Sequence, residues 1–115
     1  MNLDSRAALV KAIYEKTVNG KLEWVQTVVD DTFLVSFPSS SIDISKTKIN
    51  NDDIYLLSIY NAEAELVESI ADTDIEDYLS DSYTLLKEIF ERARTKALKV
   101  DDTIQQILSD LEKIK

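Results

Sequence analysis

The chain has 115 residues, of which 44% are hydrophobic, and its 22 acidic and 13 basic residues give a net charge of −9. This length predicts a single domain, residues 1–115, with one ordinary core. Because the sequence has no cysteine and no histidine, disulfides, cysteine-ligated zinc and the commonest general base are excluded. We expect a cytoplasmic protein, since the first residues lack a signal-peptide pattern and no stretch approaches the ~20 apolar residues of a membrane span.

The first predicted element is a helix. Apolar residues recur at helical spacing from Leu3 to Thr17, which predicts a helix over residues 3–17. Gly20 is its expected stop, because glycine readily adopts the left-handed conformation that ends many helices. Residues 22–29 are rich in β-branched and aromatic side chains, which favours a strand. The pattern leaves open whether this segment pairs with the sheet.

The next two strands are predicted from alternation of apolar and polar residues. A turn at Asp30-Asp31 leads into a strand over residues 32–37, whose Phe33, Val35 and Phe37 share one face. Pro38 and the three serines after it are expected to form the following turn. Residues 42–45 then alternate again, which predicts a short strand with one face in water.

Two further strands complete the predicted sheet. Residues 54–60 are apolar on both faces apart from one serine, which is typical of a central strand covered on both sides. The segment 61–64 is expected to turn the chain into a last strand over residues 65–70. Strands joined by short turns favour an antiparallel meander.

The C-terminal part of the chain predicts two helices. From about Ile75 the apolar spacing becomes helical and continues to Ala97, and a last helix is expected over residues 101–114 with Asp101 as its N-cap. The predicted fold class is therefore α+β, an antiparallel meander of four to five strands covered by an N-terminal helix and two C-terminal helices. Lys99 and Ala64 are expected to adopt left-handed conformations at turns that lack glycine.

The charge is distributed unevenly. No lysine or arginine occurs between Lys48 and Lys87, and this interval carries ten acidic residues, so the rest of the chain sums to +1 (−9 minus −10). The ten are Asp52, Asp53, Glu63, Glu65, Glu68, Asp72, Asp74, Glu76, Asp77 and Asp81. Close carboxylates repel one another by roughly 1 kcal/mol per pair at 4 Å even in bulk water.

Two interpretations account for this acidic segment. The first is structural, because acidic residues are favoured at a helix N-terminus, where they meet the positive end of the dipole. The second is a docking surface for a basic protein, to which carboxylates give long-range attraction and a tyrosine gives contact area. The residues predicted to bind such a partner are Glu68, Asp72, Asp74, Glu76, Asp77, Tyr78 and Asp81.

No catalytic, metal or cofactor motif is found. The spacing Asp72-x-Asp74-x-Glu76 fails the calcium-loop pattern, which needs glycine at the sixth position and glutamate at the twelfth, where Asp77 and Tyr83 stand. The only glycine, Gly20, cannot form a phosphate-binding loop. The negative charge opposes direct binding to nucleic acid.

The expected function is therefore a binding module without catalysis, metal or cofactor. Small acidic inhibitors, such as immunity proteins against nuclease toxins, have this general character. One alternative is a structural or self-assembling subunit, in which an apolar helical stripe forms an interface between copies. A further alternative is a mimic of nucleic-acid charge that binds a DNA-binding protein.

Overall fold

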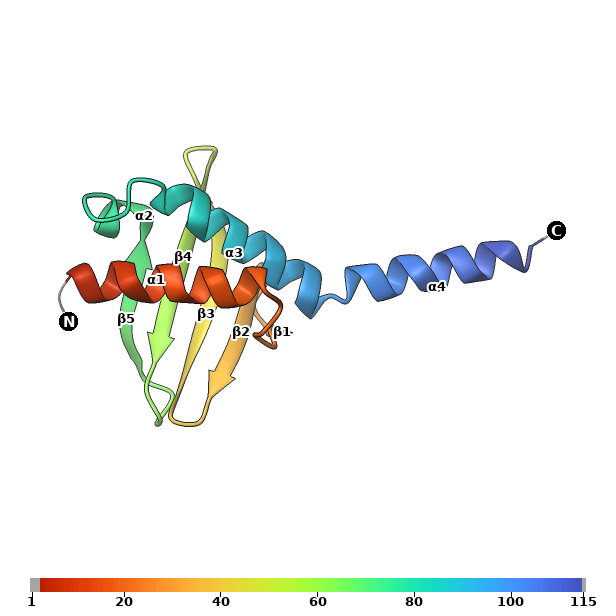
Figure 1. Cartoon of the computed structure of the whole chain (residues 1–115), viewed down its shortest axis with the longest axis horizontal. Coiled ribbons are helices and arrows are strands. Elements are labelled where there is room, and N and C mark those ends of the chain that lie inside the picture. The colour runs from red at the N-terminus through yellow and green to blue at the C-terminus, as the bar shows by residue number, and fades with distance from the viewer. Residues whose placement is uncertain (1–2, 115) are drawn as a thin grey trace.

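The computed structural model describes residues 3–114 and confirms the predicted α+β fold class (Figure 1). Its five strands form one antiparallel sheet in the order β1-β2-β3-β4-β5, with helices before and after it in the sequence. The elements are α1 Leu3–Val18, β1 Val25–Gln26, β2 Thr32–Phe37, β3 Ser40–Ile49, β4 Asp52–Tyr60, β5 Leu66–Ala71, α2 Asp72–Ile75, α3 Ser82–Ala97 and α4 Val100–Glu112.

The core lies between one face of the sheet and the helices α1 and α3, which cross that face (Figure 1). A cross-strand row of buried side chains runs through four strands, because Phe33 pairs with Ile44, Ile44 with Leu57 and Leu57 with Ile70. Phe90 of α3 packs on this row, with its ring centroid 5.5 Å from that of Phe33. The apolar residues of the alternating pattern thus lie on the face of the sheet that the helices cover.

Helix α1 ends as the sequence predicts. Gly20 has a φ of +70°, the left-handed conformation expected of a helix stop. The chain then brings Trp24 into the core, where its indole N–H donates to the Thr17 hydroxyl at 3.2 Å. This hydrogen bond satisfies both polar groups inside a largely apolar environment.

The segment 22–29 joins the sheet over two residues only, since β1 is Val25–Gln26 paired with β2. The prediction of a strand over all eight residues is therefore wrong. The reason is the Thr27 side chain, which accepts from the Val29 amide at 3.1 Å and donates to the Thr32 carbonyl at 3.0 Å. These local bonds replace a strand ladder and close a loop, and Asp31 ends that loop with a φ of +52°.

The hairpin between β2 and β3 is tighter than predicted. The turn is Pro38-Ser39, and the other two serines already belong to β3. The short strand predicted at 42–45 is in fact ten residues long. It ends in a two-residue turn, Asn50-Asn51, in which both residues have positive φ. Asparagine tolerates this conformation, and such turns match the twist of a hairpin.

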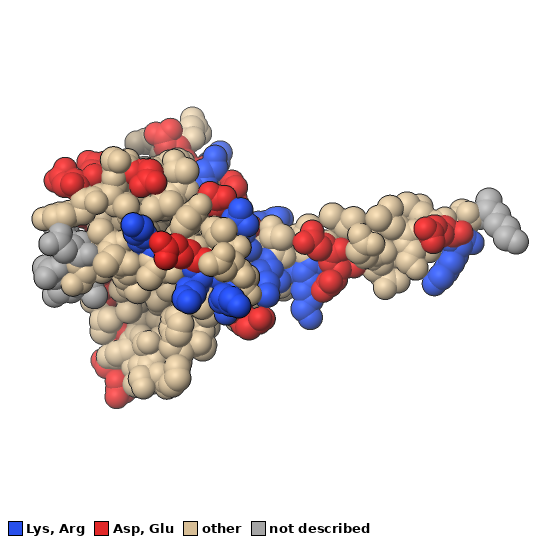
Figure 2. All heavy atoms as spheres, in the orientation of Figure 1, with Lys and Arg blue, Asp and Glu red and all other residues tan. Residues whose placement is uncertain are grey.

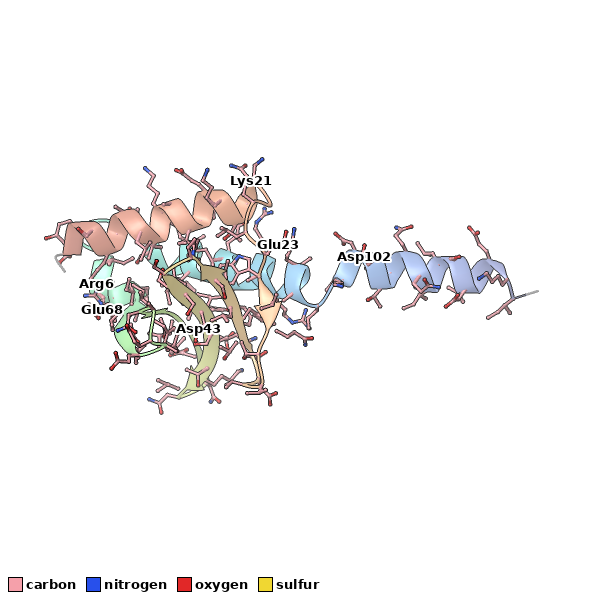
Figure 3. All side chains as sticks on the ribbon, turned by 90° about the horizontal axis from the view of Figure 1, so that it is seen from below. Arg6, Lys21, Glu23, Asp43, Glu68 and Asp102 are labelled. Carbon is pink, nitrogen blue, oxygen red and sulfur yellow. The ribbon has the colours of Figure 1, made fainter. Side chains whose placement is uncertain are left out.

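The sheet is covered on one face only. In the described residues the helices lie on the same side of it, and no element packs on the other (Figures 1 and 3). The prediction that residues 54–60 form a doubly covered strand is therefore wrong. On the open face Ile54, Leu56 and Tyr60 of β4 stay partly exposed, whereas Tyr55 and Leu57 on the covered face are buried.

The long helix after the sheet begins at Ser82, so the predicted start near Ile75 is wrong. The short helix α2 ends at Ile75, and the amides of Tyr78 and Leu79 both donate to the Ile75 carbonyl. The buried Ser82 hydroxyl then donates to the Asp72 carbonyl at 3.0 Å and fixes the loop between the two helices. Aspartate and serine side chains compete with helical hydrogen bonding, which favours a break in this segment.

Helix α4 is present as predicted, but it extends away from the sheet (Figure 1). Its N-cap is Lys99, in a left-handed conformation with φ of 53° as expected, and Asp101 lies within the first turn instead of capping it. The radius of gyration is 16.1 Å and the dimensions are 60 × 33 × 27 Å. A compact domain of this length would have a radius of roughly 13 Å, and the projecting helix accounts for the difference.

Ala64 provides a test of the turn between β4 and β5, because it has a φ of +63°. We expect Ala64→Gly to stabilise the protein by up to ~1 kcal/mol, since glycine lacks the Cβ that disfavours this conformation. Urea unfolding measures the change. Ala62→Gly is the matched control in the same turn, because Ala62 does not have a positive φ. A loss of stability in Ala64→Gly equal to that in the control would contradict strain at this position.

Candidate functional site

The seven residues predicted to bind a partner lie on β5, α2 and the loop before α3. Figure 2 shows carboxylates gathered over this end of the molecule, which is opposite to α4, and basic side chains gathered nearer to the α3–α4 junction. The acidic residues of β5, α2 and the loop before α3 thus gather at one end of the fold, whereas the other four of the interval lie at the two ends of β4. The seven predicted residues nevertheless differ in their contacts.

Arg6 of α1 pairs with two of the seven. Its guanidinium Nη2 lies 3.2 Å from Asp74 Oδ2 and 3.7 Å from Glu68 Oε1, and it donates to the Ser69 carbonyl at 2.9 Å (Figure 3). The Arg6 side chain is only 13% exposed, so these contacts are shielded from water and screened less than surface pairs. Asp74 also accepts from the Ala71 amide at 2.8 Å. Glu68 and Asp74 therefore have structural roles.

The other five residues form what we call the acidic surface: Asp72, Glu76, Asp77, Tyr78 and Asp81. Tyr78 is 52% exposed, as predicted. Within residues 3–114 none of the four carboxylates takes part in an ion pair. Two of them lie at helix N-termini, where the helix dipole favours a negative charge: Asp72 is in the first turn of α2, and Asp81 is the N-cap of α3, although without a side-chain hydrogen bond. Glu76 and Asp77 lie between the two helices.

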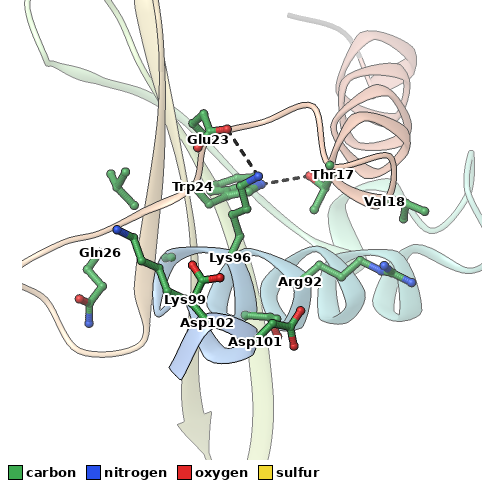
Figure 4. Close-up of a pocket in the computed structure, with 14 residues that line it drawn as sticks. Thr17, Val18, Glu23, Trp24, Gln26, Arg92, Lys96, Lys99, Asp101 and Asp102 are labelled. Atoms are coloured by element: carbon green, nitrogen blue, oxygen red, sulfur yellow. Dashed lines mark hydrogen bonds and ion pairs between the residues drawn. The ribbon is translucent and has the colours of Figure 1, made fainter. Parts of the chain in front are cut away.

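A groove with a volume of about 760 Å³ lies at the other end, between α1, β1, α3 and the start of α4 (Figure 4). Sequence analysis did not identify it, since its walls come from segments far apart in the chain. Two of its three basic side chains have partners: Lys96 lies 3.5 Å from Glu23, and Arg92 lies 3.2 Å from Glu88, whereas Lys99 forms no ion pair within residues 3–114. The start of α4 adds two aspartates to the wall, so the acidic and basic side chains that line the groove balance. The groove therefore has no net charge that would attract an anion.

The open face of the sheet carries a polar cluster around Asp43 on β3. The Tyr60 hydroxyl donates to Asp43 Oδ2 at 2.8 Å, and Ser58 stands opposite Asp43 on β4. Burial raises the pKa of the Asp43 carboxyl, and hydrogen bonds from Tyr60 and Ser58 partly offset that rise. Burial and the bond to Asp43 also raise the pKa of Tyr60. At neutral pH the phenol thus remains a hydrogen-bond donor.

Helix α4 exposes an apolar stripe. Every side chain from Asp101 to Ile114 is exposed, yet the sequence of the helix is amphipathic. What we call the apolar stripe of α4 consists of Ile104 (49% exposed), Ile107 (52%), Leu108 (50%) and Leu111 (56%), together with Ile114 (71%), which follows the end of the helix. These positions recur at intervals of three and four residues, which places them along one side of a helix.

Within residues 3–114 the stripe is not covered by any other part of the chain. An isolated helix shorter than ~12–15 residues is marginal in water, because most helical stability in proteins comes from packing of an apolar face. α4 has 13 residues and buries none of them. Removing the exposed half of each stripe side chain from water would contribute roughly 1 kcal/mol per residue. The fold therefore leaves α4 with a strong tendency to bind an apolar surface.

Comparison with known proteins does not assign a function. No protein-family model, no curated protein and no solved structure matches the chain. Across residues 3–114 no three acidic side chains converge in a geometry that could hold a metal ion. No helix in that range combines the length and hydropathy that a membrane crossing requires.

Asp43 makes the stability dependent on pH. A carboxyl with a raised pKa binds its proton more tightly in the folded state, so its contribution to stability is complete below about pH 4 and is lost as pH rises through the folded-state pKa. We therefore expect Asp43→Asn to be more stable than the unchanged protein at pH 7, with an advantage that disappears below about pH 4. Thermal unfolding of both proteins between about pH 4 and pH 7 measures this difference in stability.

The control must remove the same charge elsewhere, and Glu63→Gln does so at an exposed position. A matching rise in stability in Glu63→Gln would attribute the effect to the net charge of −9 instead of burial. Tyr60→Phe tests the hydrogen bond separately. It should destabilise the protein by about 1 kcal/mol at pH 7, because it removes one of the two donors, Tyr60 and Ser58, to a partly buried carboxylate.

Proposed function

We propose that the protein is a non-catalytic protein-binding module whose recognition element is the apolar stripe of α4. The observation that carries this proposal is that five large apolar side chains on one side of a helix are all about half exposed or more. Contiguous apolar patches of this kind on soluble proteins mark sites of interaction. An amphipathic helix that projects from a folded body is a common form of such a site.

The charges of α4 favour a protein partner over a lipid surface. Helices that lie on membranes are typically rich in lysine and arginine, which anionic lipids attract. α4 instead carries Asp101, Asp102 and Asp110, with Glu112 near its end, and its described basic residue, Lys113, pairs with Asp110 at 4.0 Å. An anionic membrane would repel this helix, whereas a protein groove or another helix would bury the stripe.

The stripe variant Ile107→Ser/Leu111→Ser tests this proposal. Because α4 lies outside the core, we expect its urea unfolding at low protein concentration to stay within ~0.5 kcal/mol of the unchanged protein. The fluorescence of the buried Trp24, the only tryptophan, reports on the body alone. In affinity capture from a lysate of the source cells, the stripe variant should lose the partner that the unchanged protein retains.

The matched control is Gln105→Ser/Gln106→Ser, which makes two changes at neighbouring positions outside the stripe. It should retain the partner, and retention should persist at high salt because apolar contacts are not screened. Equal capture by the stripe variant and the control would contradict the proposal. So would a large loss of stability in the stripe variant, since the side chains would then belong to the core.

The acidic surface supports a second candidate, docking of a basic protein, as an inhibitor or immunity-type protein would do. The observation that favours it is that none of these carboxylates pairs with a base in the described chain and that Glu76 and Asp77 lie outside the helices. Carboxylates left free in this way attract a positive partner over several ångströms and accelerate encounter.

For this second candidate we expect Glu76→Gln/Asp77→Asn/Asp81→Asn to slow association with a basic partner about tenfold, with little change in dissociation. Surface-plasmon kinetics at low and high salt measure both rates. Asp30→Asn is a control for loss of an exposed charge elsewhere. Asp74 is left unchanged because Arg6 depends on it. Association rates that do not respond to the three changes would remove the acidic surface as a docking site.

A further inference from the structure

We infer that the partner of α4 is α4 of a second copy of this chain, and that the two helices pair antiparallel around a two-fold axis. This inference rests on the proposed function, because it names the occupant of the same apolar stripe. It is supported by the shape of the stripe, by the size of the body and by the distribution of charge along the molecule.

The stripe is complementary to itself when the helices run in opposite directions. Ile104, Ile107, Leu111 and Ile114 follow the alternating three- and four-residue spacing of a helix pair, and Leu108 widens the stripe at its middle. A two-fold axis near Leu108 places Ile104 of one copy opposite Leu111 of the other. It also packs Leu108 of one copy against Ile107 of the other, so the widest part of each stripe is covered.

The body of the protein excludes the parallel alternative. Packed helices lie ~8–10 Å apart, whereas the two shorter dimensions of the molecule, which the body sets, are 33 and 27 Å. Figure 1 shows that α4 leaves the body between its upper and lower limits, so body extends on both sides of the helix. Two parallel helices would force the bodies into the same space. Antiparallel helices place the bodies at opposite ends.

The position of the acidic surfaces favours the same arrangement. The α3–α4 junction itself adds little attraction, because Asp101 and Asp102 in the first turn of α4 follow the basic residue Lys99 directly. The acidic surface lies at the far end of each copy (Figure 2), so this pairing keeps the two acidic surfaces apart.

The expected interface is small. Each copy offers one side of a 13-residue helix. The area that this side can bury is smaller than the ~800 Å² per partner of a standard stable interface. We therefore expect a reversible dimer with a dissociation constant on the order of micromolar. Sedimentation equilibrium of the full chain over a hundredfold range of concentration should show the mass rising from one chain to two.

The variants described above supply the test. Ile107→Ser/Leu111→Ser should sediment as a single chain throughout the range, with the Trp24 fluorescence of the folded body unchanged. Gln105→Ser/Gln106→Ser should dimerise as the unchanged protein does. A single-chain mass for the unchanged protein at the highest concentration would overturn the inference, and so would a dimer that survives the stripe changes.

The absence of native cysteine makes the orientation measurable. Chains carrying Ile104→Cys and chains carrying Leu111→Cys, mixed and oxidised, should form the mixed disulfide if the helices are antiparallel. Predominant disulfides between identical variants would instead show parallel pairing and overturn the inference as stated. Neither variant introduces a polar group, because a free cysteine behaves as a small apolar residue.

The two proposals fail in distinguishable ways. If the unchanged chain is monomeric and the stripe variant still loses a captured protein of different sequence, the second copy is wrong as the occupant and the binding module stands. If the stripe variant sediments with the same mass as its control and captures the same protein, the proposed function is wrong as well. If dimerisation is lost only in the stripe variant, both are supported.

Discussion

The packing of α1 and α3 against the row Phe33–Ile44–Leu57–Ile70 is the constraint on which the rest of the structure depends. Each residue of the row comes from a different strand, so burial of the row fixes the register of four strands at once, and a shift of one residue would turn every apolar side chain to the open face. The same packing selects which side of the sheet the helices occupy. The ion pairs of Arg6 then fix α1 against β5 and α2 at the edge of this core.

Helix α4 has its unusual position because the core is complete without it. α1 and α3 already cover the apolar face, and the open face mixes the partly exposed Ile54, Leu56 and Tyr60 with Asp43 and several serines. The left-handed Lys99 then directs the chain away from the sheet. A stripe of this composition costs free energy when it stays in water, so an external partner gives the simplest account of why a helix forms there.

Most of the fold was predictable because its signals are local. Alternation in residues 32–37 and the glycine stop at Gly20 depend only on neighbouring residues, and both predictions are confirmed. The errors arise where distant contacts decide the outcome. Thr27 and Ser82 form hydrogen bonds that break expected elements, and periodicity cannot show whether the stripe of α4 faces its own core or another chain. For the candidate site, the exposure of Tyr78 was predictable, whereas the pairing of Arg6 with Glu68 and Asp74 was not, because Arg6 lies far from both in sequence.

The two ends of the molecule have opposite characters, and this makes the two proposed interactions compatible. The apolar stripe lies on the projecting helix, whereas the acidic surface lies beyond the sheet, where α4 does not reach (Figures 1 and 2). An antiparallel pair of α4 helices would leave both acidic surfaces free and facing away from each other. A dimer of that kind would bind a basic partner with two sites, and the second contact would form at a high effective concentration if the partner spans both. Self-association through an apolar helix would in this way strengthen an electrostatic interaction that is weak for one copy, because isolated surface charges contribute little on their own.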